Sequence, residues 1–350
     1  MNNPSPTGHF GSGPADRISI ETVRLNHPRD LLTAVPFLLG FEPDPGSVIV
    51  VALHAGRVAV TIRVESHTMD DAPRVWARLE RPLSDADVDE VAVIGYLPEH
   101  LNLQVLAFAA AAPVRLLDVL RVDDGRWWSL TCQNGPDCCP PGEPLLTNTA
   151  VSAPLIAGAG APAASRADLA RCLQPGPDDV VVAVARLLPL NPVPPAPVLY
   201  QQVVAAHTAH AAGPVPLAPE RAAVLVHALT NVNVRDACCG WHDDAAWWLW
   251  TSLIRCTPPT HVAPVASMIA TTAYQRGDTV LARLAADHAL AADPGYGLAQ
   301  LMKEVVIAQI HPAMVREVFA YAIEALADVR PSLQFEAPDP GLTRDGGSDG

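Results

Sequence analysis

Strand-type patterns stop near Cys132 in this chain, and every periodic segment after it has the spacing of a helix. Before that point, Val48–Leu53 is a continuous apolar run, as in an inner strand, and Val58–Glu65 alternates apolar with more polar residues, as in a half-buried strand. After it, apolar residues recur three and four positions apart. Because 350 residues suffice for two cores, the sequence predicts a sheet-containing domain followed by an all-helical one.

The first domain is predicted to have the element order ββαβαββ, and therefore a mixed sheet with helices packed on it. A short helix precedes this order: it begins at Pro28, is broken by Pro36, and is followed by a turn that ends at Gly40. Asp124-Gly125 between two strand-type runs indicates a hairpin. The remaining elements are expected near Pro73–Leu79 (helix), Val91–Tyr96 (strand), Pro98–Ala112 (helix), Arg115–Val122 and Arg126–Thr131 (strands).

The helical half contains one well-defined hairpin around Gly277-Asp278. Gly277 permits a tight turn, and Asp278 can accept hydrogen bonds from the free amides of the next helix. Ala282, Ala286 and Ala289 form a stripe of small side chains that allows close helix packing. Pro294 ends the second helix, since proline cannot continue it.

These spacings resemble a tetratricopeptide repeat, with Gly-Asp between the helices, two alanines at 282 and 289, and a proline five residues later. Ala286 departs from the repeat pattern, which has an aromatic residue there. The next pair, Tyr296–Gln309 and Pro312–Leu326, keeps the helix lengths but few signature positions. The alternative is an ordinary helical hairpin inside one domain.

We expect five regions: a disordered tail at 1–17, a mixed α/β domain at 18–135, a loop, helix and Pro-rich connector at 136–197, a helical domain at 198–330, and a disordered tail at 331–350. Within the connector, Ser165-Arg166-Ala167-Asp168 is a helix start of capping-box type. The helical domain is predicted to contain helices near 198–212, 219–231, 243–256, 261–276, 279–292, 296–309 and 312–326.

Charge and composition exclude several classes of protein. The formal net charge of −14 argues against bulk attraction to nucleic acid and favours solubility or a basic partner. No apolar run is long enough for a membrane span, and the N-terminus has no secretory pattern. Seven cysteines, an odd number without an export signal, indicate reduced thiols and a cytoplasmic protein.

Four segments occur in this order along the chain: Asp30–Phe41, Asp124–Ser129, Cys138–Pro141 and Ala289–Tyr296. Together they resemble the actinobacterial family called domain of unknown function 4192, over about residues 20–315. The resemblance implies a cytoplasmic actinobacterial protein and supplies no activity or site to transfer. The run Cys238-Cys239-Gly240-Trp241 departs from the family pattern.

Three cysteines, Cys132, Cys138 and Cys139, follow the predicted hairpin in a Pro-rich loop near Trp127 and Trp128. They could hold a soft metal such as zinc, with Cys172 or a histidine as fourth ligand, or act as a reactive thiol. The spacing is poor for zinc, and no histidine lies nearby in sequence to stabilise a thiolate. We therefore expect no cofactor and cysteines that pack as small apolar groups.

Other motifs favour structure over chemistry. In Cys238–Asp244 the acidic residues are expected to cap a helix, and the glycines of Gly158–Ala163 lack the preceding strand of a dinucleotide site. His207 and His210 share a predicted helix face that we expect to be solvated. Trp247, Trp248 and Trp250 cover nearly all sides of one helix and predict its burial.

The function expected from these patterns is a non-catalytic, cytoplasmic protein-interaction or regulatory module that binds a protein partner or itself. The predicted contact residues are Tyr274, Arg276 and Tyr296 in the helical half, with Trp127 and Trp128 as a further candidate surface. The alternative is a thiol- or metal-dependent enzyme with its site at Cys132, Cys138 and Cys139.

Overall fold

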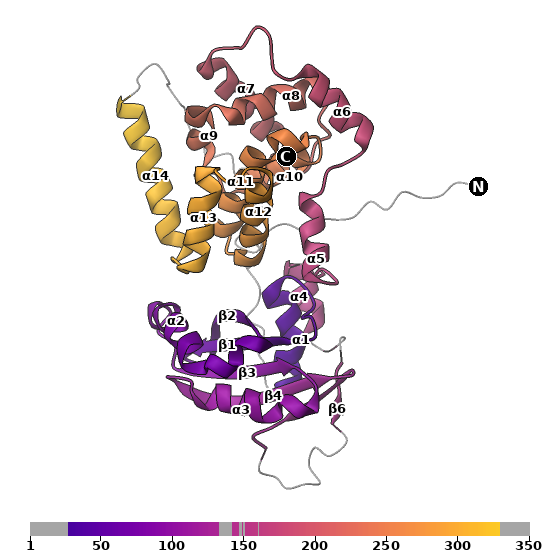
Figure 1. Ribbon diagram of the computed structural model, residues 1–350, viewed down its shortest axis with the longest axis vertical. Helices are drawn as coiled ribbons and strands as arrows, with labels where there is room; N and C mark the ends of the chain where they lie inside the picture. The colour runs from indigo at the N-terminus through magenta and orange to yellow at the C-terminus, as the bar shows by residue number, and fades with distance from the viewer. Residues whose placement is uncertain (1–26, 133–141, 147–148, 150, 160, 330–350) are drawn as a thin grey trace, which may run out of the picture. The chain divides into compact units, whose positions relative to one another are not determined.

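The computed structural model describes residues 27–132, 142–146, 149, 151–159 and 161–329 (Figure 1). The chain divides into two compact units, Met1–Arg171 with Gln309–His311, and Cys172–Ala308 with Pro312–Gly350. The division falls inside the 136–197 range predicted as connector. The two predicted tails and the start of the first domain near Ile18 lie outside the described residues.

The first unit contains a mixed sheet with packed helices, as predicted. The described residues form six strands, one more than the five of the predicted order, because the two-residue strand Glu143–Pro144 is additional. The strand order is β2-β1-β3-β4-β5-β6, with β3 and β4 parallel and every other neighbouring pair antiparallel. The strands are β1 Ser47–His54, β2 Arg57–Glu65, β3 Glu90–Tyr96, β4 Arg115–Asp123, β5 Arg126–Ser129 and β6 Glu143–Pro144; the helices are α1 Pro28–Leu39, η1 Ser66–Asp71, α2 Ala72–Asp85, η2 Glu99–Leu101, α3 Asn102–Ala110, α4 Ser152–Ala159, α5 Arg166–Leu169 and η3 Ala170–Leu173, which ends in the second unit.

The core of this unit lies between the sheet and helices α2 and α3. Strand β1 pairs on both edges and is buried from Ser47 to Ala52, which confirms the prediction of an inner strand. Trp76 of α2 stacks on Phe108 of α3 with ring centroids 5.1 Å apart, and its indole N–H donates to the Phe108 carbonyl at 2.8 Å. The large ring is thus buried with its polar atom satisfied.

One turn and one proline inside a helix test the sequence-based predictions directly. Asp124 and Gly125 both have positive φ, 47° and 69°, between the paired residues Asp123 and Arg126, so the predicted Asp-Gly hairpin is confirmed. The expectation that Pro36 breaks the first helix is wrong. Helix α1 continues through Pro36 to Leu39 and ends at Gly40 with φ 80°. Burial of the flanking apolar residues outweighs the one backbone hydrogen bond that proline removes.

The second unit is all helical, as predicted. The seven predicted helical ranges each contain a helix, and α6 and α9 are additional. Helix α6 is rich in valine, which also favours strands, and helix α9 has only seven residues. Neither segment therefore shows a clear helical period. The helices are α6 Asp178–Leu187, α7 Ala196–Ala209, α8 Pro219–Thr230, α9 Val232–Cys238, α10 Asp244–Ile254, η4 Pro259–His261, α11 Val262–Gln275, α12 Thr279–Ala292, α13 Gly297–Ile307 and α14 Pro312–Val329.

Helix α11 is the centre of this unit. Every residue from Ala263 to Gln275 is buried, and the helix packs against α8, α10, α12, α13 and α14. Helices α11 and α12 form the predicted hairpin: Gly277 has φ 85°, and the Asp278 carboxylate accepts from the Leu281 amide at 2.9 Å. Ala282, Ala286 and Ala289 are fully buried, as a small-residue stripe requires.

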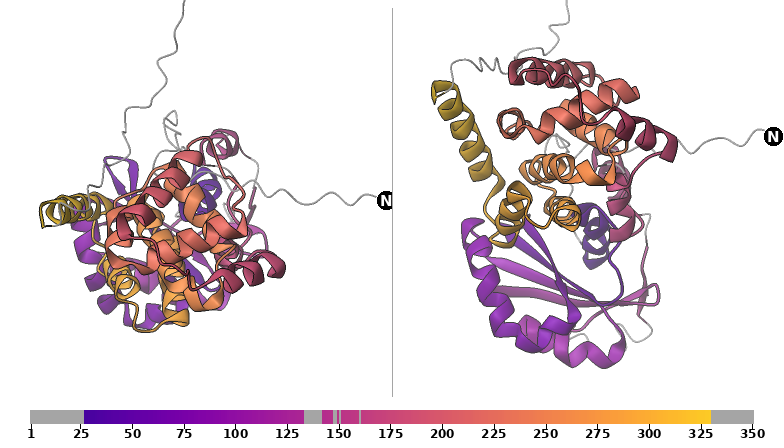
Figure 2. Two further views of the ribbon diagram at one scale, coloured as in Figure 1. Left: turned by 90° about the horizontal axis from the view of Figure 1, so that it is seen from above. Right: turned by 45° about the horizontal axis from the view of Figure 1, so that its top comes forward.

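Helix α14 (yellow) lies at the rim of the helical unit in Figure 1 and in both views of Figure 2. It packs on α11 and α9. Among the described residues, no helix is both long enough and apolar enough to cross a membrane.

The turn at Gly277 predicts that two glycine-to-alanine substitutions have different effects on the free energy of unfolding. At both Gly277 and Gly297 a Cβ would meet no atom within 4 Å, but only Gly277 has a positive φ. Gly277→Ala should lower the free energy of unfolding by about 1 kcal/mol, because L-residues are strained in that backbone region. Gly297→Ala should leave it unchanged or raise it slightly. Urea titration followed by circular dichroism measures both, and equal effects would contradict this account of the turn.

Candidate functional site

Two of the predicted contact residues, Tyr274 and Arg276, lie in the interior of the helical unit. Tyr274 is 2% exposed, and its hydroxyl donates to the Val305 carbonyl at 3.3 Å. Arg276 is 1% exposed; its guanidinium donates to the His242 carbonyl at 2.9 Å and to Asp244 Oδ1 at 2.6 Å. Both side chains therefore bind neighbouring helices of the same unit and offer no surface to a partner.

The loop 239–243, between α9 and α10, is held by the carboxyl-terminal end of α11. Gln275 Nε2 donates to the Cys239 carbonyl at 2.8 Å, and the Thr272 hydroxyl donates to the Trp241 carbonyl at 3.1 Å. With Arg276 on the His242 carbonyl, three side chains satisfy three loop carbonyls. Each of these hydrogen bonds contributes to stability, because its loss would leave a loop carbonyl without this partner.

The Cys/His/Asp run in this loop supplies the helix cap that was expected from its acidic residues. Asp243 is the N-cap of α10 and accepts from the Ala246 amide at 2.8 Å. Cys238 and Cys239 are buried. Within the part of the chain that the structure describes, no group of three or more His, Cys, Asp or Glu residues could hold a metal ion.

The expectation of a solvated face at His207 and His210 is wrong, because both are buried. His207 lies 2.9 Å from Asp243 through Nε2, and its ring centroid is 4.6 Å from that of Trp241. His210 Nδ1 lies 2.7 Å from the Ala206 carbonyl. The missing carboxylate partner of His207 was 36 residues away in sequence, so no local pattern could reveal it.

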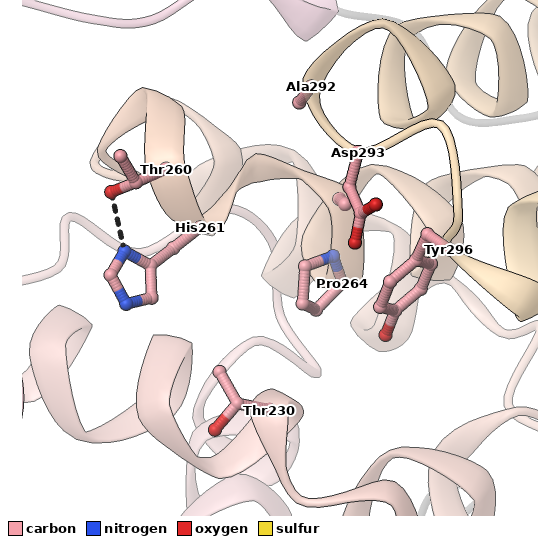
Figure 3. A pocket seen from close by; sticks show the side chains of 8 residues that line it. Thr230, Thr260, His261, Pro264, Ala292, Asp293 and Tyr296 are labelled. Atoms are coloured by element: carbon pink, nitrogen blue, oxygen red, sulfur yellow. Dashed lines mark hydrogen bonds between the residues drawn. The ribbon is translucent and has the colours of Figure 1, made fainter.

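The third predicted contact residue in the helical half, Tyr296, lines a pocket of about 230 Å³ (Figure 3). In Figure 3, Pro264 lies between the His261 and Tyr296 side chains, with Thr230 opposite. The pocket is lined by Thr230, Thr260, His261, Ala263, Pro264, Ala292, Asp293 and Tyr296.

Several polar groups of this pocket are already bonded within the chain. The Tyr296 hydroxyl accepts from Arg235 at 2.9 Å, the Thr230 hydroxyl donates to the His227 carbonyl at 2.7 Å, and Thr260 Oγ1 lies 2.9 Å from His261 Nδ1. Burial raises the pKa of Tyr296, and burial together with His227 lowers the pKa of His261. A lining whose polar groups are mostly bonded within the chain suits a shallow contact with a side chain better than acid–base chemistry.

Sequence reasoning missed a group of exposed apolar side chains on α14. Met314, Val318 and Tyr321, here called the α14 stripe, are 50%, 60% and 74% exposed. They are four and three residues apart and so share one helix face. That spacing was visible in the sequence, but the face that points outward was not.

The opposite face of α14 attaches the helix to the unit. Val315 is buried, and Arg316 donates to the Gln275 carbonyl at 2.5 Å. Ile323 lies against Gly240, where a Cβ would come within 2.9 Å of its Cδ1 atom. The attachment is narrow, since Val315 is the one buried side chain among residues 312–324.

Trp127 and Trp128 pack within the first unit. Trp127 is 4% exposed, and its ring is 5.8 Å from that of His27 in an edge-on arrangement. The guanidinium of Arg121 lies 3.8 Å above the Trp128 ring, and Gly142 approaches that ring so closely that no Cβ would fit. Trp128 therefore covers the segment that follows the cysteine loop.

The predicted cysteine cluster is only partly within the described residues. Cys132 is exposed, whereas Cys138 and Cys139 lie outside the described part of the chain. Cys172, named as a possible fourth ligand, is buried in the helical unit. Of the glycine pattern at 158–163, Gly158 lies within helix α4 and Gly160 is outside the described residues.

The Asp243 cap predicts a small acid-dependent loss of stability. Burial opposes ionisation of Asp243, but hydrogen bonds from His207 and the Ala246 amide outweigh it and hold the pKa of this carboxyl below its usual value. A carboxyl whose pKa is lower in the folded state than in the unfolded state stabilises the fold at pH values above the unfolded-state pKa. This stabilisation is lost as the pH falls through the folded-state pKa.

Wild type should therefore lose stability relative to Asp243→Asn below about pH 4, because asparagine also caps helices but does not titrate. The side chain is 57% exposed, so the difference should stay below about 1 kcal/mol. Urea midpoints at a series of pH values measure it. A constant difference between the two proteins from neutral pH to about pH 3 would contradict the assignment.

Burial also predicts which thiols are inert. It raises the pKa of Cys172 and Cys239 to about 12, the pKa of Cys238 well above its usual value, and the pKa of Cys256. Because the thiolate is the reactive form, iodoacetamide at about pH 8 should modify Cys132 quickly and these four only after unfolding. Peptide mass spectrometry measures the extent of modification at each cysteine.

Rapid modification of Cys238 or Cys239 in the folded protein would contradict the structure. Thiol labelling, together with metal analysis of the purified protein, also tests the enzyme alternative. A hyper-reactive thiol at Cys132, Cys138 or Cys139, or stoichiometric zinc in the purified protein, would favour the thiol- or metal-dependent enzyme.

Comparison with known proteins gives one result. No curated protein and no solved structure matches the chain. The family model described as "Domain of unknown function (DUF4192)" matches residues 28–313, which covers both the mixed sheet and the helices through the start of α14. The chain therefore belongs to the DUF4192 family.

Proposed function

We propose that this chain is a non-catalytic protein-interaction module of the cytoplasm, which binds its partner through the α14 stripe. The supporting observation is the exposure of Met314, Val318 and Tyr321 on a helix that also has apolar residues on its opposite face. Exposed apolar side chains that gather on one surface can mark an interaction site. Helix α14 buries one side only, so its other side has the composition of an interface core.

The packing order of the helices supports the same proposal. Helices α11, α12 and α13 pack one on the next, as in tetratricopeptide-like arrays. Such arrays normally end in a helix with a polar outer face, which keeps the end soluble. Here the last described helix presents Val318 and Tyr321 at 60% and 74% exposure. Helix α14 packs on α11 and α9, and its exposed apolar face suits the addition of another helix.

The location and the lack of catalysis have separate support. An odd number of cysteines, four of them buried among the described residues, suits a reducing compartment. The described pocket at Tyr296 has an internally bonded lining, and the described residues contain no metal-binding cluster. The α14 stripe is therefore the described feature with the clearest potential for binding.

Val318→Glu in the full-length protein tests the proposal. A charge placed in the interface should weaken partner binding about tenfold or more, because a buried valine contributes about 1.5–3 kcal/mol and a buried unpaired carboxylate costs more. Leu103→Glu is the matched control, since Leu103 is 79% exposed on α3 of the other unit. Binding is measured by quantitative cross-linking in source cells and self-association by sedimentation velocity.

Circular dichroism melts should be alike for both variants, since neither side chain is buried. Loss of binding with Val318→Glu and its retention with Leu103→Glu is the expected result. Retention of every partner by Val318→Glu would show that the α14 stripe is not the binding surface.

A further inference from the structure

The α14 stripe has acidic side chains along one border. Glu317 precedes Tyr321 by four residues and Glu324 follows it by three, so both carboxylates are neighbours of Tyr321 on the helix surface. Both residues are exposed. No ion pair involves either carboxylate among the residues that the structure describes.

We infer that the α14 stripe binds an amphipathic helix whose apolar face is bordered by lysine or arginine, an inference that rests on the proposed function. The apolar residues Met314, Val318 and Tyr321 have the four-three spacing with which one helix packs along another. Helix α14 has 18 residues and is ~27 Å long, so it accommodates about five turns of a partner helix.

The nearest cation on the helix does not neutralise this border. Arg316 points to the other side of α14, where it donates to the Gln275 carbonyl. Among the described residues, Glu317 and Glu324 are therefore open to pairing with cations of a partner. The net charge of −14 adds long-range attraction for a basic segment and repulsion for an acidic one.

A second copy of this chain fits the stripe less well. It would bring the same apolar residues with the same two carboxylates. Antiparallel pairing of two α14 helices would place Glu317 beside Glu324 of the other copy, and parallel pairing would leave both carboxylates without a cation. Like charges across an interface act against association.

Two synthetic peptides test the inference against the full-length protein. Both carry the same leucine heptad seam; one has lysine and the other glutamate at the bordering positions. Fluorescence anisotropy should show about tenfold tighter binding of the lysine peptide to wild type, because two rim ion pairs replace two like-charge contacts. This preference should shrink as salt rises.

Two charge variants distinguish the effect of the α14 carboxylates on peptide preference from the effect of the overall net charge. Glu317→Lys with Glu324→Lys should reverse the peptide preference. Glu80→Lys with Glu304→Lys changes the net charge equally at exposed sites on α2 and α13 and should preserve it. Reversal in both variants would show that overall charge, rather than the α14 border, selects the peptide, and would overturn the inference.

The remaining outcomes distinguish this inference from the proposed function. Equal binding of both peptides, abolished by Val318→Glu, would overturn the basic partner and keep the docking surface. Binding of neither peptide, with self-association that depends on Val318, would assign the stripe to a second copy and also overturn the basic partner. Binding of neither peptide with no effect of Val318→Glu in any assay would overturn both.

Discussion

The helical unit depends on the requirement that a fully buried helix must satisfy its own polar side chains. Helix α11 buries every residue from Ala263 to Gln275, including hydroxyl and amide groups that would be costly to leave unpaired. Thr272, Gln275 and Arg276 meet part of this requirement by donating to carbonyls of the loop 239–243, although Gln275 Oε1 and Arg276 Nε are buried without a hydrogen-bond partner. The same bonds that satisfy α11 therefore fix how α9 and α10 approach it.

This constraint explains why the predicted contact residues are not on the surface. Tyr274 and Arg276 lie where the hairpin reverses, a place where polar residues in repeat proteins often face outward. Here the loop 239–243 and helix α13 cover that end, so the tyrosine hydroxyl and the guanidinium serve internal carbonyls. Arg276 also pairs with Asp244, whose side chain is half exposed, so the charge is compensated without being sealed from water.

The same end of α11 positions the candidate binding helix. The Gln275 carbonyl, left free at the helix terminus, accepts from Arg316 of α14. Gly240 in the loop admits Ile323 of α14. The polar network inside the unit and the apolar stripe outside it are thus connected through one helix that attaches on a single face. A narrow attachment leaves Met314, Val318 and Tyr321 exposed.

Much of the fold could be predicted because local chemistry determines it. Asp124-Gly125 specifies its hairpin through positive φ, Asp278 caps α12 through its carboxylate, and the unbroken apolar run of β1 indicates a strand that is covered on both faces. These signals need only adjacent residues. The prediction that Pro36 breaks α1 was wrong because it considered only the local loss of one backbone hydrogen bond. The burial that stabilises α1 comes from contacts with segments distant in sequence.

The sequence alone determined the order of the first five strands and of most helices, the turn at Gly277 and the family resemblance that the family model confirms. Only the tertiary structure decided which helix faces point inward: it buries His207 against Asp243, turns Arg276 to the interior, and leaves Val318 and Tyr321 exposed. Periodicity records the spacing of side chains along one helix, whereas burial depends on which distant segments pack against it. That choice is made by long-range contacts that no local pattern encodes.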